Sequence, residues 1–563
     1  MRLPDKRVDP RVSGRYRRNR APARAGDGED EVISRGDHGY VSAKSGAAAL
    51  YEYSVPGAEA FQPTDTAVAS KPSPSRFATL FLLFSVELIA LMIAKLPETM
   101  SFENFAFCDR GANLTLQYLV ANGLRPAIDF GYHYGLLPIL IARGWFAVFG
   151  ASPTAYQLAM LACNILFAWA LAKIITRLQV GGIGLALAII ALGFAFQSSY
   201  PNLAQALEAV LLCVAIAEQA RGSRNNALAL ATAAVFSKPS MGYVYGVLLV
   251  ILIVRDLART GFTLRRLFDT VAPATVVFIG LATTLSVAYG ARTFLRTILP
   301  IEGATAYHSL NFGLTGSGRP LWDPKGLPWI HYLVDASGLW IASSACLFGG
   351  ALFQLSTTHS DENSERRSEI VVTCAILHLA FLTLFFGNQW SWIYYSYLPV
   401  IGCAIAVNLG PVQRRVGLAL CAIALLSWTS TVYWSQRRWQ TTARDIATAG
   451  LWATPNETEE WSRVLTITRS KNAVLMSSMG AAELLFPGFE KPVSLFLMRG
   501  LMTASDVERK TSQLSSAQMV VVPVLPGPCD GCAGAPEFSS AMKSFGPTWT
   551  GQHLEVLERR STR

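Results

Sequence analysis

Long apolar runs are the feature of this sequence that most restricts its fold. Runs of roughly 17 to 25 residues, the length that crosses the hydrocarbon core of a membrane, recur between residues 77 and 434. Hydrophobic residues make up 51% of the 563 residues and charged residues only 15%, a balance too apolar for an ordinary soluble protein. The pattern predicts an α-helical polytopic membrane protein with polar segments at both ends.

The two polar ends differ in kind. Residues 1–76 are rich in Arg, Gly, Ser, Pro and Asp and lack apolar periodicity, which predicts a disordered basic tail. Residues 435–563 combine helix-like segments with two strand-like ones, 472–478 and 519–524, which predicts a small α/β domain. The expected organisation is therefore a tail, a membrane domain of residues 77–434 and a C-terminal α/β domain.

The net charge of +10 is concentrated in the first 25 residues and in basic clusters at the ends of apolar runs. This placement indicates topology signals and contacts with membrane lipids, and it argues against a nucleic-acid partner. The basic tail before the first span places the N-terminus in the cytoplasm, as expected for a multi-pass protein of the inner (plasma) membrane.

Residues 135–150 decide the remaining topology. If this short apolar stretch crossed the membrane, the later basic clusters would face outside; as an in-plane helix it leaves them inside. We therefore predict about 11 spans, with in-plane helices in a first outer loop (97–153), a second outer loop (291–335) and a periplasmic C-terminal domain. The expected spans are 77–96, 155–175, 180–197, 202–219, 225–237, 241–254, 271–289, 336–355, 370–387, 393–409 and 416–434.

Several motifs follow one another in and after the first outer loop. Asp109 lies in CDRGANLTLQYLVANG, Asp129 lies in the aromatic turn IDFGYHYG, Phe149-Gly150 ends the in-plane stretch, and Lys238 opens a KPS motif. Their order resembles the GT-C superfamily, the membrane glycosyltransferases that use polyprenyl-phosphate donors, which includes dolichyl-phosphate-mannose–protein mannosyltransferases and aminoarabinose transferases. The resemblance covers residues 77–254 and implies a polyprenyl-phosphate-linked sugar donor.

The sequence departs from that family pattern at three positions. Arg110 follows Asp109 where many members have Asp-Glu, and a Pro-Pro pair is reduced to Pro138. Gln157 stands where an arginine commonly begins the next span. Other cations are therefore expected to bind the donor phosphate.

Asp109 is the predicted catalytic base. Glycosyl transfer needs a group that takes the proton of the acceptor hydroxyl, and a carboxylate at the membrane surface can serve. The alternative is that Asp109 caps the helix that follows it. Asp129 is either a substrate-binding carboxylate or a local cap. Glu103, Asp109 and Asp129 are candidate ligands of a divalent metal ion, the one cofactor considered, although Glu103 also fits a solvated loop charge.

Further candidates concern the substrate. Tyr132 and His133 can stack on a sugar face, or they anchor the loop at the membrane interface. The leaving polyprenyl phosphate requires cations, for which Lys238 is the strongest candidate because it lies between two apolar segments. Glu208, within an apolar run, is a similarly exceptional charge. The other candidate cations are Arg292, Arg296 and Arg319.

The sequence thus predicts an integral-membrane glycosyltransferase. It would move a sugar from a polyprenyl-phosphate donor to an envelope lipid, glycan or protein on the outer face of the inner membrane. Two alternatives stay open: an enzyme like O-antigen ligases or polymerases, and a non-enzymatic lipid-glycan transporter. A transporter is disfavoured because the sequence contains no internal repeat.

Overall fold

The computed structural model describes residues 74–197, 202–299, 336–356, 362–384, 395–407, 411–477, 479–497, 501–523 and 536–560. All of them belong to one compact unit, Ala69–Arg563. The predicted tail, apart from its last three residues, and most of the predicted second outer loop lie outside the described residues.

Helices account for residues 74–441 wherever the structure describes regular elements. Typical start signals are visible in the sequence: at α6, Ser152 accepts a hydrogen bond from the backbone N–H of Ala155 (3.1 Å) and Pro153 takes the first helical position. The helices are α1 (Pro74–Ala94), α2 (Leu96–Thr99), α3 (Phe102–Ala106), α4 (Asp109–Ala121), α5 (Leu137–Phe149), α6 (Pro153–Arg177), α7 (Gly182–Gln197), α8 (Leu203–Ala220), α9 (Arg224–Ser237), α10 (Met241–Thr260), α11 (Leu264–Tyr289), α12 (Ala291–Ile298), α15 (Ala336–Ser356), α16 (Glu362–Leu384), α17 (Tyr397–Ala406) and α18 (Pro411–Thr441).

Seven of the described helices are long and apolar enough to cross a membrane: α1, α6, α8, α10, α11, α15 and α18. Every one of the predicted spans overlaps a helix, and several of these helices, such as α7 and α17, are shorter or more polar. The chain is therefore a multi-pass membrane protein, as the sequence predicts. Which side of the membrane each end faces stays a prediction.

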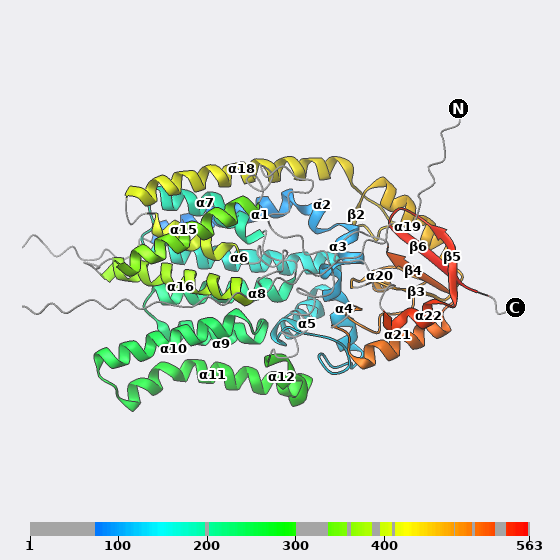
Figure 1. Cartoon of the computed structure of the whole chain (residues 1–563), viewed down its shortest axis with the longest axis horizontal. Helices are drawn as coiled ribbons and strands as arrows, with labels where there is room; N and C mark the ends of the chain where they lie inside the picture. Colours follow the sequence, from blue (N-terminus) through cyan, green and yellow to red (C-terminus); the bar gives the residue numbers. More distant parts are fainter. Residues whose placement is uncertain are drawn as a thin grey trace, which may run out of the picture. The chain divides into compact units, whose positions relative to one another are not determined.

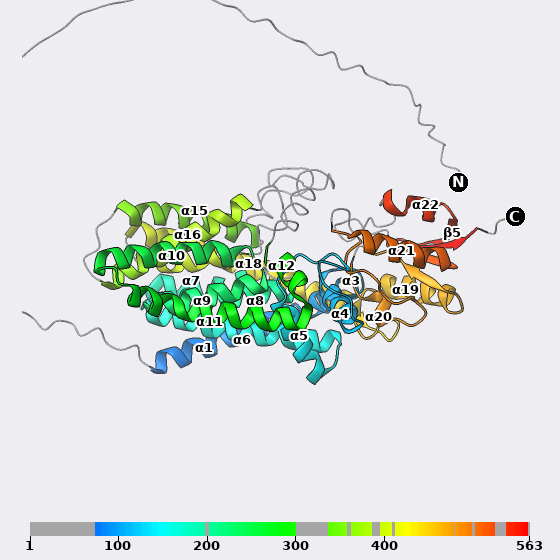
Figure 2. The same cartoon turned by 90° about the horizontal axis from the view of Figure 1, so that it is seen from below.

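The long helices run side by side, and the short helices gather at one end of them (Figures 1 and 2). Helices α3, α4, α5 and α12 lie at this end, between the long helices and the C-terminal strands. The stretch predicted to be an in-plane helix forms α5, which is apolar and too short for a span. The 97–153 segment is thus placed between two large parts of the fold.

The C-terminal part contains the predicted mixture of helices and strands. Strands β3 and β4 occupy the two strand-like segments; they pair in parallel, β6 pairs antiparallel with β4, and β5 closes the sheet in the order β3-β4-β6-β5. Helix α18 continues past the predicted domain boundary at residue 434. The elements are β1 (Ala443–Arg444), β2 (Trp452–Ala453), α19 (Pro455–Thr468), β3 (Ala473–Leu475), α20 (Ala482–Leu485), α21 (Ala504–Ser516), β4 (Met519–Pro523), η2 (Pro536–Phe538), α22 (Ser539–Met542), β5 (Phe545–Thr550) and β6 (Leu554–Arg559).

An aromatic cluster joins the 97–153 segment to the C-terminal part. The fully buried ring of Trp461 on α19 lies 5.2 Å from the ring of Phe102, 5.8 Å from that of Phe107 and 4.9 Å from that of Phe486, measured between centroids. Aromatic pairs at such distances add stabilisation beyond the area they bury. Helix α3 therefore belongs to the core of the C-terminal part as much as to the membrane part.

Candidate active site

Helix α4 carries a polar stripe. Asp109, Asn113 and Gln117 are spaced four residues apart, so the helical period places them on one face. All three line a cleft whose empty space, including open solvent, is about 410 Å³.

The other walls of the cleft come from four separate segments. Tyr132 and Tyr134 come from the aromatic turn, where the Tyr132 hydroxyl donates to the carbonyl of Gly135 (2.9 Å). Asn202, at the start of α8, donates to the hydroxyl of Tyr134 (3.3 Å). The remaining lining residues are Ala112 and Leu116 of α4, Pro138 and Ala142 of α5, Ala204 of α8, and Leu495 and Phe496 of the C-terminal part.

The carboxylate of Asp109 is half-buried at this cleft. Burial raises the pKa of Asp109 to about 6, although the neighbouring Arg110 guanidinium opposes the shift. No residue in the described part of the chain donates a hydrogen bond to this carboxylate. The N-cap of α4 is Cys108, and no side-chain capping bond is present there. The Asp109 side chain therefore does not cap α4 in this structure.

Two of the positions that depart from the family pattern contact each other. Arg110 donates to the side-chain oxygen of Gln157 (3.3 Å), and Gln157 donates in turn to the hydroxyl of Thr99 (3.2 Å). Burial lowers the pKa of Arg110, while Tyr156, Glu98 and Asp109 favour its charged form. Arg110 therefore places a positive charge at the start of α4, next to Asp109.

Glu103, Asp109 and Asp129 have different surroundings. Asp129 pairs with Arg125 (3.0 Å), and this hydrogen-bonded pair holds the pKa of Asp129 below its usual value. Burial and the nearby carboxylate of Glu457 raise the pKa of Glu103. Across the described ranges, no three His, Cys, Asp or Glu side chains come together as a set of metal ligands. Glu103, Asp109 and Asp129 therefore do not form such a set of ligands.

The predicted substrate-binding cations are dispersed. Lys238 is buried and donates to the hydroxyl of Tyr395 (3.2 Å), and Tyr395 donates to Glu208. Arg296 of α12 donates to the carbonyl of Ala127 (3.0 Å) and so braces the 97–153 segment. Arg292 is exposed on the same helix, His133 is half-buried in the aromatic turn, and Arg319 lies outside the described residues. Of the predicted substrate-binding residues, Tyr132 lines the cleft with Asp109.

The cleft also contains polar residues that the sequence analysis missed. Asn113 and Gln117 were detectable, because with Asp109 they place a polar residue at every fourth position of the helix and so mark one polar face. Asn202 also caps α8, accepting from the backbone N–H of Gln205 (3.1 Å). Leu495 and Phe496 gave no local signal, because only the tertiary fold brings them to the cleft.

Hydrogen bonds connect the segments that line the cleft to the C-terminal part on one side and to the membrane part on the other. On the C-terminal side, Gly131 donates to the carboxylate of the fully buried Asp506 (2.9 Å), and Thr115 donates to the carbonyl of Gly480 (2.6 Å). On the membrane side, Gly135 donates to the carbonyl of Ser237 (2.9 Å), next to Lys238. The aromatic turn is therefore fixed between the two parts of the fold.

Cys108, directly before Asp109, is disulfide-bonded. We expect Cys108→Ser to lower the free energy of unfolding by about 2–4 kcal/mol, because the disulfide restricts the unfolded chain. Thermal unfolding with and without a phosphine reductant measures this: the reductant should lower the midpoint of the wild type and leave the variant unchanged. The matched control is Cys346→Ala, which removes a free cysteine and should keep the wild-type response. An equal response of Cys108→Ser and wild type to the reductant would contradict the prediction. Cys529 and Cys532 lie outside the described residues.

Comparison with solved structures finds chains of similar fold. No family model and no curated protein matches the sequence. The fold is similar to the crystal structure of ArnT from Cupriavidus metallidurans bound to undecaprenyl phosphate, at 13% sequence identity and a TM-score of 0.49. The match covers 87% of this chain and 99% of that chain.

Proposed function

We propose that this protein is a membrane glycosyltransferase that moves a sugar from a polyprenyl-phosphate donor to a hydroxyl of an envelope lipid, glycan or protein. The observation that carries the proposal is the Asp109 carboxylate: it lies at a cleft lined by polar and aromatic side chains, accepts no hydrogen bond from a described residue and has a raised pKa. Perturbed carboxyl groups at a cleft are typical of acid–base catalysts.

In the proposed reaction Asp109 takes the proton of the acceptor hydroxyl. The acceptor oxygen forms a bond to the anomeric carbon of the donor sugar, and the bond from that carbon to the phosphate oxygen breaks with its electron pair. The products are the glycosylated acceptor and a polyprenyl phosphate. Asn113, Gln117 and Asn202 supply hydrogen-bonding groups along the cleft, and Tyr132 and Tyr134 supply aromatic faces for a sugar ring.

The negative charge that develops on the leaving phosphate requires cations. We propose Arg110, next to Asp109 on α4, as the first of them. Lys238 is the second candidate, because its turn is bonded to the aromatic turn through Ser237. Arg292 and Arg296 on α12 are proposed to contact phosphate headgroups at the membrane surface.

The test is transfer by the purified full chain in proteoliposomes that contain undecaprenyl phosphates carrying radiolabelled sugars, with envelope glycolipid and glycan extracts as acceptors. We expect label to move to an acceptor and undecaprenyl phosphate to be released in equal amounts. Use of diphosphate-linked donors alone would favour the ligase or polymerase alternative. Movement of labelled lipid between leaflets without transfer would favour a transporter and reject the proposal.

The pH dependence of transfer provides a second prediction. A general base acts in its deprotonated form, so kcat/KM should fall as pH drops through the raised pKa of Asp109, about 6. Between pH 7 and pH 5 we expect a loss of about tenfold, measured in the proteoliposome assay with a fixed donor. A profile that stays flat down to pH 4.5 would exclude Asp109 as the base.

A further inference from the structure

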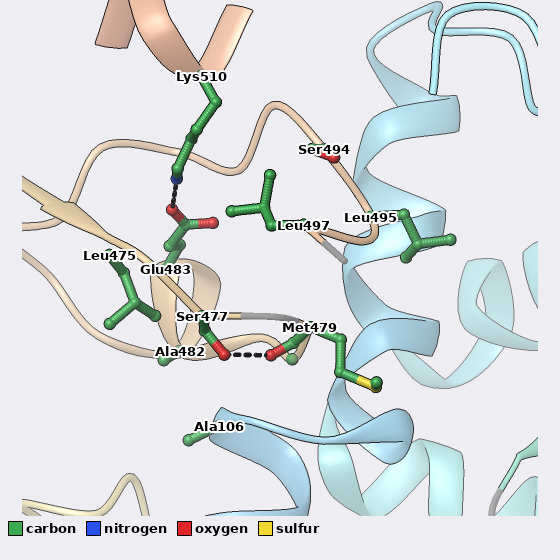
Figure 3. Close-up of a pocket in the computed structure, with 11 residues that line it drawn as sticks. Ala106, Leu475, Ser477, Met479, Ala482, Glu483, Ser494, Leu495, Leu497 and Lys510 are labelled. Carbon is green, nitrogen blue, oxygen red and sulfur yellow. Dashed lines mark hydrogen bonds and ion pairs between the residues drawn. The ribbon is translucent and has the colours of Figure 1, made fainter. Parts of the chain in front are cut away.

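A second cleft lies between the C-terminal sheet and α3 (Figure 3). It opens where β3 ends, at the carboxyl edge of the parallel strand pair, the edge at which α/β folds commonly bind ligands. Its empty space, about 320 Å³, includes open solvent, so the cleft is partly open at the protein surface. Its walls come from Ala106 of α3, Lys510 of α21 and residues of the stretches 475–477, 479–483 and 494–497.

A buried ion pair forms the polar side of this second cleft. Lys510 and Glu483 point toward one another from α21 and α20 in Figure 3, with 2.8 Å between Nζ and Oε1. Their side chains are only 2% and 13% exposed. Taking both charges out of water is costly, and apolar residues of similar size would often serve stability equally well. A buried pair that also lines a cleft therefore suggests a role in binding.

The pair retains hydrogen-bonding capacity. An ammonium group has three N–H donors and a carboxylate has two oxygens, whereas the bond between them uses one donor and one oxygen. Two hydroxyls lie in the same cleft: Ser477 donates to the carbonyl of Met479 (2.6 Å) and Ser494 to that of Phe496 (3.0 Å), and each hydroxyl oxygen can still accept.

The second cleft adjoins the Asp109 cleft. Leu495 lines both of them, and Phe496, next in sequence, lines the Asp109 cleft. Ala106 of α3 and Asp109 of α4, which line one cleft each, are three residues apart. A molecule with one sugar ring in the second cleft would therefore extend toward the proposed base.

We propose that the cleft around Glu483 and Lys510 is the acceptor subsite and binds a neutral, hydroxyl-rich sugar ring of the acceptor. The proposal rests on the proposed function, because it takes the Asp109 cleft as the place of transfer. The paired charges present a donor and an acceptor side by side, which matches two neighbouring hydroxyls of a sugar. A phosphate would face the Glu483 carboxylate and a cation would face the Lys510 ammonium, so a neutral ligand fits best.

The test is saturation-transfer NMR on the full chain in detergent micelles, with methyl α-glucoside, α-galactoside and α-mannoside as probes. At least one glycoside should receive saturation from the wild type. The double variant Glu483→Gln/Lys510→Met, which removes both charges together and leaves neither one buried alone, should lose at least fivefold of this signal. The matched control is Lys471→Met/Glu558→Gln, which removes a more exposed pair of the same sheet and should keep the wild-type signal.

The outcomes separate this subsite from the proposed function. Equal glycoside signals in the wild type and the Glu483/Lys510 double variant, or no glycoside signal from a folded wild type, overturn the subsite even if transfer is observed. A signal from inorganic phosphate that displaces the glycosides also overturns it. If glycoside binding depends on the Glu483–Lys510 pair but the protein transfers no sugar, the sugar-binding subsite is supported and the proposed function is rejected.

Discussion

Asp109→Asn is expected to lower the transfer rate by about 10²–10⁴-fold, the usual contribution of a general base, while the protein stays at least as stable as the wild type at pH 7. The pKa of Asp109 is raised to about 6 because burial disfavours its charged form. A carboxyl group whose pKa is higher in the folded than in the unfolded state destabilises the folded state when it ionises. This destabilisation is fully present above pH 6 and absent below the unfolded pKa. The Asp109→Asn variant carries a neutral amide of the same size and therefore lacks this destabilisation.

The matched control is Asp129→Asn in the neighbouring aromatic turn. Its pKa is lowered by the pair with Arg125, so it contributes stability that is present above its unfolded pKa and lost as the pH falls. Asp129→Asn should therefore lower the unfolding midpoint slightly and change transfer only a few-fold. Thermal unfolding and the proteoliposome assay on both variants separate the two roles. If Asp109→Asn instead lost stability and kept its transfer rate, the side chain would be structural and the proposed base would be wrong.

The sequence predicts the membrane part of the fold well because span length and apolarity are local properties. Such local signals explain why every predicted span overlaps a helix. They also explain the short helix α5 at the end of the long helices. The two strand-like segments likewise became β3 and β4, since runs of buried aliphatic residues are visible without knowledge of their partners.

The candidate site is only partly visible in the sequence. Asp109 stands out because it follows the first span and opens a helix, and Lys238 and Glu208 stand out as charges among apolar residues. Their link through Tyr395, which accepts from Lys238 and donates to Glu208, depends on a residue 157 positions after Lys238. The bond between Gly131 and Asp506 joins residues 375 positions apart. Such contacts leave no periodic pattern, because only the packing of distant helices creates them.

Gly111→Ala is expected to displace α4 from its neighbours and to lower both stability and transfer. A Cβ at Gly111 would lie 1.8 Å from the carbonyl oxygen of Phe105 and 2.7 Å from the backbone nitrogen of Ala481. These two atoms are themselves hydrogen-bonded at 2.9 Å, so the new carbon would separate α3 and α4 from the C-terminal part. Backbone atoms cannot rotate away as the end of a side chain can. We expect a loss of about 1–3 kcal/mol in the free energy of unfolding, as for other overpacked sites.

The effect of Gly111→Ala on transfer should exceed its effect on folding, because Asp109 lies two residues earlier on the same first turn of α4. A catalytic group misplaced by about 1 Å can cost on the order of 10²-fold in rate, so the folded fraction of the variant should transfer sugar at least tenfold more slowly. The matched control is Gly144→Ala on α5, where an added Cβ meets nothing within 4 Å. There the gain in helix propensity, up to about 1 kcal/mol, should leave stability equal or higher and transfer unchanged. Identical unfolding midpoints and transfer rates for the two alanine variants would show that the close packing of α4 against the C-terminal part does not position Asp109.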